Sequence, residues 1–201
     1  MKNIFVLLIV LLLCNSVSGQ WKAQAGEMYD KTFRMAYVTS KSGNATLRVL
    51  RNIPLDTKGK AANPYDQITG QILLNKKIEK EYVVQCLVFS FDDSPKIYIH
   101  QPSGFKQSWD PNSKKYIIES DWKMWRLDDR RNKDITKGGK NPDSIPTDKQ
   151  ISIADIIQLL KSHQIVHCQV VLMHEFLETQ TIIDSEFTLQ NSTKSINFLF
   201  Q

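Results

Sequence analysis

The chain has 201 residues, with 26 basic and 21 acidic side chains and a formal net charge of +5 at pH 7. This length fits one domain with its own hydrophobic core, or one domain that carries a long loop. Because both signs of charge are mixed along most of the sequence, the composition argues against a nucleic-acid-binding face, which needs clustered lysine and arginine.

The N-terminus has the pattern of an export signal. Lys2 supplies a positive charge, residues 4–13 form an unbroken apolar run, and Val17 and Gly19 are small residues at the positions that signal peptidase requires. We therefore predict cleavage before Gln20.

The apolar run is too short for a membrane anchor, since it has about half of the roughly 20 residues that span a bilayer. No second run of spanning length follows. We expect residues 1–19 to be a signal peptide and residues 20–201 to form a single secreted or periplasmic β-rich domain without a transmembrane segment.

The first predicted element of the domain is a β-hairpin over residues 32–52. Apolar and polar residues alternate on both sides of Ser42 and Gly43, which suit a tight turn. Further strands are predicted at residues 68–74 and 82–91.

The strand at residues 82–91 is apolar on both sides, as expected for a central strand. Strict alternation places Val84, Cys86 and Val88 on one face. A short strand at residues 96–100 follows a turn.

The middle of the chain is richer in loops. Residues 101–115 suggest a long loop, and residues 116–127 suggest a strand, although their apolar spacing also fits a helix. Residues 128–149 are charged and rich in glycine and proline, which predicts a long mobile loop.

The C-terminal part begins with an amphipathic helix at residues 153–162. Ser152 and Asp155 have the spacing of a capping box, in which each side chain bonds the other residue's backbone amide. Strands are predicted at residues 165–172 and 181–189, and a short helix can follow. The fold class is mainly β (α+β): a two-layer antiparallel β-sandwich with one principal helix in the C-terminal half.

Two cysteines remain after the predicted cleavage, Cys86 and Cys168, each within an apolar strand. In an oxidising compartment they can form one disulfide across the core. Two buried thiols are the alternative, and the sequence gives no Cα distance to decide between them.

No catalytic or metal-binding motif can be assembled from neighbouring residues. His163 and His167 are four residues apart but fall on different elements, and no phosphate-binding glycine loop is present. We expect no metal and no cofactor.

Aromatic and basic residues gather next to the predicted mobile loop. Such residues are frequent at binding hot spots, although aromatic residues are more often part of the core or core rim of a sandwich. The candidate binding patch consists of Tyr116, Trp122, Trp125, Arg126, Arg130 and Arg131.

The order of elements in the C-terminal part resembles that of a known family. A capped helix ending in Leu159-Leu160-Lys161 precedes a strand, and Phe187-Thr188-Leu189 precedes a polar turn and an apolar end. This order, with the hairpin at residues 32–52, is similar to the invasion-associated locus B family of small exported proteins. The family's cysteine pattern is not reproduced. The resemblance implies a β-sandwich and a non-catalytic role in the cell envelope.

The sequence therefore predicts an exported, non-catalytic binding or accessory protein of the cell envelope or extracellular space, with a protein partner. The alternative is a secreted hydrolase that uses His100, His167 or His174 with a distant carboxylate. A third interpretation is a carbohydrate-binding module. A histidine and an acid in one concave pocket would favour the hydrolase.

Overall fold

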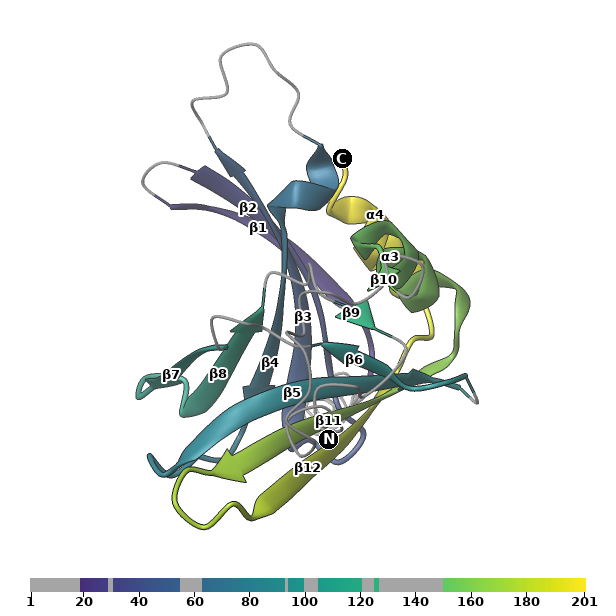
Figure 1. The fold of residues 1–201 in the computed structure, drawn as a ribbon. Coiled ribbons are helices and arrows are strands. Elements are labelled where there is room, and N and C mark those ends of the chain that lie inside the picture. The colour runs from purple at the N-terminus through teal and green to yellow at the C-terminus, as the bar shows by residue number, and fades with distance from the viewer. Residues whose placement is uncertain are drawn as a thin grey trace, which may run out of the picture.

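The computed structural model describes residues 19–28, 31–54, 63–92, 94–99, 105–120, 125–126 and 150–201. These residues form two six-stranded antiparallel sheets and two α-helices (Figure 1). The mainly β, two-layer fold predicted from the sequence is confirmed. The predicted signal peptide up to residue 18 and the predicted loop at residues 128–149 lie outside the described residues.

Sheet A has the strand order β1-β2-β3-β4-β8-β7. Its strands are β1 (Lys22–Met28), β2 (Lys31–Thr39), β3 (Ala45–Pro54), β4 (Ile68–Leu74), β8 (Lys115–Ser120) and β7 (Lys106–Asp110). The predicted hairpin is β2 and β3, and Gly43 in its turn has a φ of 71°, a left-handed conformation that glycine adopts without strain.

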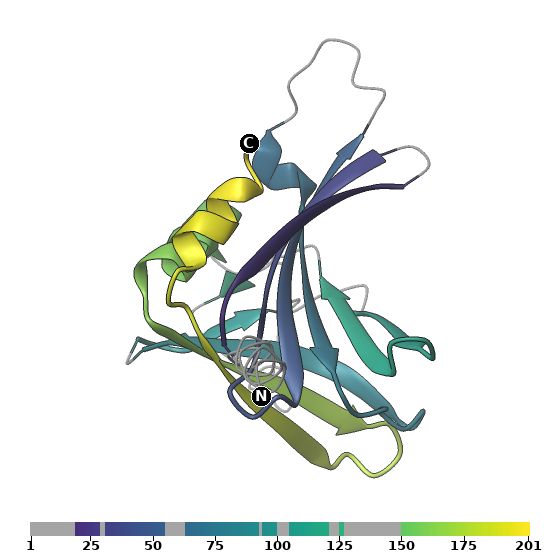
Figure 2. The ribbon, with the colours of Figure 1, turned by 180° about the vertical axis from the view of Figure 1, so that it is seen from behind.

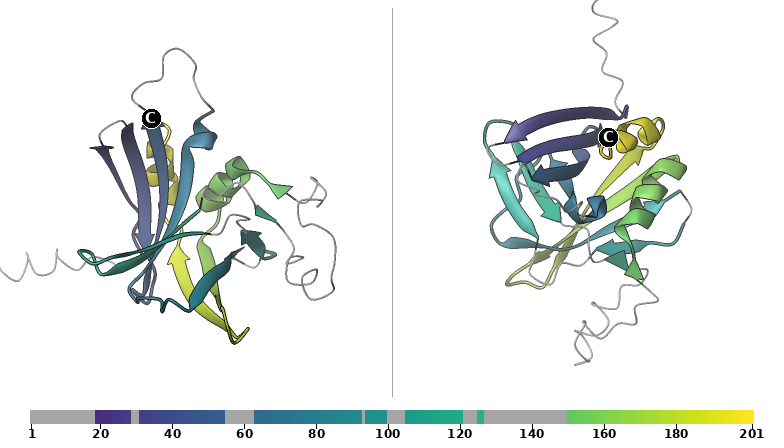
Figure 3. Two further views of the ribbon diagram at one scale, coloured as in Figure 1. Left: turned by 60° about the vertical axis from the view of Figure 1, so that its left-hand side comes forward. Right: turned by 90° about the horizontal axis from the view of Figure 1, so that it is seen from above.

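Sheet B has the strand order β10-β9-β6-β5-β11-β12. Its strands are β10 (Gln150–Ile151), β9 (Trp125–Arg126), β6 (Ile97–Ile99), β5 (Tyr82–Phe91), β11 (Ile165–His174) and β12 (Gln180–Thr188). The strands of the two sheets run in clearly different directions (Figure 3). β10 and β12 are the edges of sheet B, and β1 and β7 are the edges of sheet A.

The helices cover one end of the space between the sheets. α3 (Ile153–Ser162) and α4 (Ser192–Phe198) lie side by side near the C-terminus, where the Ser192 hydroxyl donates to the Leu160 carbonyl at 2.6 Å (Figure 2). A short 3-10 helix, η1 (Pro64–Gln67), lies at the same end. The predicted capping box of α3 is present, with Ser152 and Asp155 exchanging side-chain and backbone bonds.

One hydrophobic core fills the space between the sheets. Leu47 and Ile72 of sheet A, Phe89 and Phe187 of sheet B, and Leu160 of α3 are all nearly inaccessible to solvent. Burying a side chain of this kind stabilises a fold by about 1.5–3 kcal/mol. The sandwich therefore depends on both sheets and on the helix that closes one end.

A bulge in β5 changes the predicted pattern of its faces. The pairing of β5 with β11 shifts by one residue, so that Leu172 lies opposite Val84 and Val171 lies opposite Cys86. Val84 therefore faces the main core, while Cys86 and Val88 face the outside of sheet B and pack with Val171 in a second, small cluster. Strict alternation is wrong for Val84 because a bulge adds one residue to a strand.

The register of β5 and β11 beyond the bulge excludes the disulfide, because Cys168 lies opposite Phe89, an odd number of residues from Cys86. Cys168 belongs to the main core and Cys86 to the small cluster on the opposite face of the same sheet, and the two are not bonded to each other. Their side chains point apart, which a disulfide does not permit. Burial, with a smaller effect of Asp184, raises the pKa of the Cys168 thiol well above its usual range. The alternative of two buried thiols is the arrangement found.

Two segments in the middle of the chain differ from expectation. Residues 106–110, predicted as part of a loop, form β7, in which Trp109 lies opposite Tyr116 of β8. The predicted strand at residues 116–127 is interrupted, since β8 ends at Ser120 in sheet A and β9 belongs to sheet B. The first difference is due to β7, a polar strand at the edge of sheet A. The second arises because β8 belongs to sheet A and β9 to sheet B.

Candidate functional site

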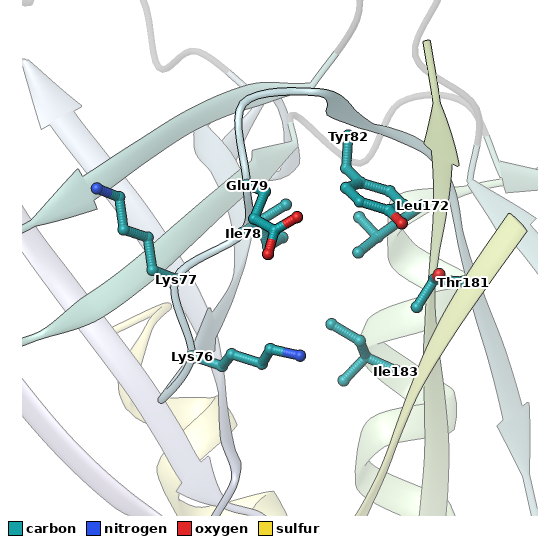
Figure 4. Close-up of a pocket in the computed structure, with 8 residues that line it drawn as sticks. All are labelled: Lys76, Lys77, Ile78, Glu79, Tyr82, Leu172, Thr181 and Ile183. Carbon is teal, nitrogen blue, oxygen red and sulfur yellow. The ribbon is translucent and has the colours of Figure 1, made fainter. Parts of the chain in front are cut away.

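A hollow of about 200 Å³ lies at the end of the sandwich opposite the helices (Figure 4). It opens between the connection that joins β4 to β5 and the far ends of β5, β11 and β12. We call it the end hollow. It is lined by Lys76, Lys77, Ile78, Glu79, Tyr82, Leu172, Thr181 and Ile183.

The floor of the end hollow is apolar. Ile78 and Leu172 are buried members of the main core, and Ile183 and Tyr82 are partly buried against it. Mouths of β-sandwiches and barrels are frequent places for ligands because apolar surface there borders solvent. The floor can therefore receive an apolar group without any rearrangement of the core.

The rim of the end hollow is charged. Figure 4 shows the Lys76 ammonium and the Glu79 carboxylate extending over the hollow, while the Lys77 ammonium points away from it. All three side chains are exposed. The rim therefore offers one positive and one negative group above the apolar floor.

Local sequence explains why the β4–β5 connection lies here. Ile78 is an isolated apolar residue in the polar segment 75–81, and its burial anchors the segment to the core. The amide of Asn75 donates to the Asn44 carbonyl at 2.9 Å, and its side chain donates to the Gly43 carbonyl at 2.5 Å. The connection is thus fixed at both its start and its middle.

The β11–β12 hairpin ends next to the end hollow in an apolar tip. Phe176 is 78% exposed and Leu177 is 67% exposed. Nδ1 of His174 accepts bonds from the amides of both residues, at 3.2 and 3.1 Å, and its ring meets the edge of Tyr82 at a centroid distance of 5.0 Å. His174 is therefore a structural part of the turn, in which Glu178 has a φ of 52°.

The other three histidines lie away from the end hollow or outside the described residues. His163 terminates α3, where its amide donates to the Leu159 carbonyl at 3.2 Å. His100 lies outside the described residues. His167 lies exposed on the outer face of sheet B.

His167 does share a concave site with an acid. A hollow of about 230 Å³ on the outer face of sheet B, which we call the outer hollow, is lined by Val88, Ser90, Lys96, His167, Gln169 and Asp184. Strand register places Ser90 opposite His167, and His167 opposite Glu186. A hydroxyl, an imidazole and a carboxylate thus stand in one row across three strands.

Two members of this row, Ser90 and Glu186, are bonded to other residues. Ser90 donates to the Ser94 carbonyl at 3.1 Å. Nδ1 of His167 lies 4.0 Å from the nearest Glu186 oxygen, which is too long for a hydrogen bond. Glu186 pairs with Lys41, and this bond lowers the pKa of the Glu186 carboxyl, with smaller help from the charges of Lys41 and His167.

A third hollow, of about 410 Å³, lies between α3 and the turn after β5. Its lining is mostly apolar, including Phe91, Ile97 and Leu159. The carboxylate at its edge belongs to Asp155, which already bonds the amide and hydroxyl of Ser152. The end hollow is the better candidate site because its charged groups extend over it.

The structure describes three of the six residues of the predicted binding patch: Tyr116, Trp125 and Arg126. Tyr116 is partly buried against the main core in sheet A and donates to the Gln107 side chain at 3.1 Å; burial raises its pKa. Trp125 and Arg126 form β9 in sheet B. Trp122, Arg130 and Arg131 lie outside the described residues, so the patch stays a prediction.

Within the described ranges, no group of three or more histidine, cysteine or acidic side chains is placed to hold a metal ion. No helix among those residues is both long and apolar enough to cross a membrane. Comparison of the chain with protein-family models, curated proteins and solved structures gave no match.

Proposed function

We propose that this chain is an exported, non-catalytic binding protein of the cell envelope or extracellular space, and that the end hollow is its binding site. The observation that supports the proposal is the combination of an apolar floor with a charged rim. An apolar floor provides affinity and a few placed polar groups provide orientation, as in most ligand sites.

Trp21 supports the export part of the proposal. Its side chain is buried in the main core, and its indole Nε1 donates to the Thr188 carbonyl at 2.8 Å. A core side chain thus lies one residue after Gln20, at which cleavage is predicted to leave the mature N-terminus. An intact mass that retains residues 1–19 in the purified native protein would contradict export by cleavage.

The binding site is tested with an amphipathic dye, 1-anilinonaphthalene-8-sulfonate, whose rings suit the floor and whose sulfonate suits Lys76. We expect the fluorescence gain to be lost in Ile183→Trp, which fills the hollow. The matched control is Ile182→Trp, on the opposite face of the same strand, which should keep dye binding.

Folding of both variants is checked by circular dichroism. Lys76→Glu, an exposed substitution, tests the site without changing the floor and should weaken dye binding. Equal dye binding by the wild-type protein and all three variants would refute the end hollow as the site.

The row of Ser90, His167 and Glu186, of which the first two line the outer hollow, favours a second candidate function, a hydrolase that uses these three residues. The row has the residue types of a nucleophile, a base and an orienting acid. Its test is the hydrolysis of p-nitrophenyl acetate by wild-type protein and by Ser90→Ala and His167→Ala. Turnover that disappears in both variants would establish the hydrolase and overturn the non-catalytic proposal.

A further inference from the structure

One of the two edge strands of sheet B, β12, is covered along its second half. The backbone amides and carbonyls of its odd-numbered residues point toward β11 and bond it. The 2.6 Å bond from the Leu189 amide to the Gln164 carbonyl, just after the end of β12, shows this alternation. Its even-numbered residues direct their backbone groups away from the sheet. Three outward carbonyls accept bonds: Asp184 from the Asn44 side chain (3.1 Å), Glu186 from the Lys41 amide (2.9 Å) and Thr188 from the Trp21 indole (2.8 Å).

The first half of β12 is uncovered. By the same alternation, Ile182 directs its amide and its carbonyl outward, and no partner for either is found in the part of the chain that the structure describes. Its side chain is 50% exposed. Unpaired backbone groups at a sheet edge are a template for another strand.

The uncovered half of β12 is also a wall of the end hollow. Thr181 and Ile183, which flank Ile182, both line the hollow. In an antiparallel pair, residues directly opposite each other place their side chains on the same face. A strand added beside Ile182 would therefore direct the side chains opposite Thr181 and Ile183 toward the hollow.

The charges of the rim favour a neutral occupant. Lys76 and Glu79 extend over the hollow with opposite signs, so a highly charged ligand would be attracted by one and repelled by the other (Figure 4). A peptide segment carries no net backbone charge but has donors for the carboxylate and acceptors for the ammonium. Its side chain can bury against Ile78 and Leu172.

We propose that β12 binds an extended peptide of a partner protein by strand addition at Ile182, with one bulky apolar side chain of the peptide inserted into the end hollow. This inference rests on the proposed binding function and names its ligand class. Main-chain bonds supply affinity in such complexes and the pocket supplies specificity. Because the open edge is short, we expect weak binding, with a Kd between about 10 µM and 1 mM.

The probe is an acetylated and amidated nonapeptide with lysine at each end, a central phenylalanine and threonine elsewhere. Phenylalanine, opposite Thr181 or Ile183, fills the hollow, and one of the two residues beside it stands opposite Ile182. We expect N-methylation of the two neighbouring amides to abolish binding. N-methylation of the phenylalanine amide, which faces away from β12, should leave binding intact, and replacing phenylalanine with asparagine should weaken it by about tenfold or more.

The protein variants separate this inference from the proposed function. Ile182→Pro removes the outward amide without removing a bond to β11, while Ile182→Thr keeps that amide. Peptide binding should fall about three- to tenfold or more in the proline variant and stay near the wild-type value in the threonine variant. Dye binding in the end hollow should be unchanged in both.

Three results would overturn strand addition. One is no binding of the nonapeptide up to about 1 mM, the weak end of the expected range. Another is equal binding by wild type and Ile182→Pro. The third is a concentration-dependent dimer that Ile182→Pro abolishes, because a second copy of the chain would then occupy the edge. If dye binding nevertheless depends on Ile183, the proposed function survives any of these results.

Discussion

The two halves of β12 differ in how their outward backbone groups are satisfied. From Asp184 to Thr188, the outward carbonyls of β12 accept hydrogen bonds from the β2–β3 turn and from Trp21, which precedes β1. Around Ile182, no group in the described ranges bonds the outward amide or carbonyl. The covered half joins the two sheets and serves stability. The open half borders the end hollow, so in our proposal it serves binding.

The largest effect is expected at the covered half, in Trp21→Ala. The variant removes a buried indole and its bond to Thr188, and large-to-small changes of this kind cost about 3–5 kcal/mol. Urea unfolding followed by circular dichroism measures the loss. A cost below about 1 kcal/mol would show that the N-terminal segment adds little to the core.

A smaller loss is expected in Asn44→Ala. The Asn44 side chain donates to the Asp184 carbonyl and accepts from the hydroxyls of Ser40, Ser42 and Ser185. Removing it leaves the buried Ser40 without this acceptor, which costs about 1–3 kcal/mol. Asn112→Ala, an exposed turn substitution outside this network, is the control and should unfold at nearly the wild-type urea concentration.

A pair of proline variants tests the contrast directly. Ile182→Pro should change the free energy of unfolding by less than about 1 kcal/mol, because its amide has no ladder partner. Ile183→Pro should cost clearly more, because its amide bonds β11. Similar losses in both variants would mean that the first half of β12 is not open.

The smallest effect concerns the pH dependence at Glu186. Its bond to Lys41 lowers the carboxyl pKa below the ordinary 4.5, so the folded state binds the proton less readily than the unfolded state. The stability that this provides is present above pH 4.5 and is lost as pH falls through the lowered pKa. In Lys41→Met the acid-side decline should be shallower, as thermal unfolding at a series of pH values would reveal.

The regular parts of this fold follow from local pattern. The capping box at Ser152 and Asp155 and the hairpin turn at Gly43 depend on residues close in sequence, and both were predictable. The bulge between Val84 and Cys86 depends on pairing with β11, about eighty residues away, and no local pattern announces it. For that reason the face of Val84 could not be predicted.

The end hollow was not predicted, because its lining converges from distant segments. Lys76 and Glu79 precede β5, while Thr181 and Ile183 lie in β12. One signal was present in the sequence. Ile78 is a lone apolar residue in a charged connection, and such a residue often anchors a loop to a core.

The bond between Trp21 and Thr188 links positions 167 residues apart, so the first part of the domain to be synthesised packs against nearly the last. Contacts of such long range form late, because the intervening chain must be ordered first. A growing chain therefore cannot complete this core before Thr188 has been added. Ribosome-bound chains that end before Thr188 should therefore lack the full protease resistance of the complete domain, and full resistance in such chains would contradict this.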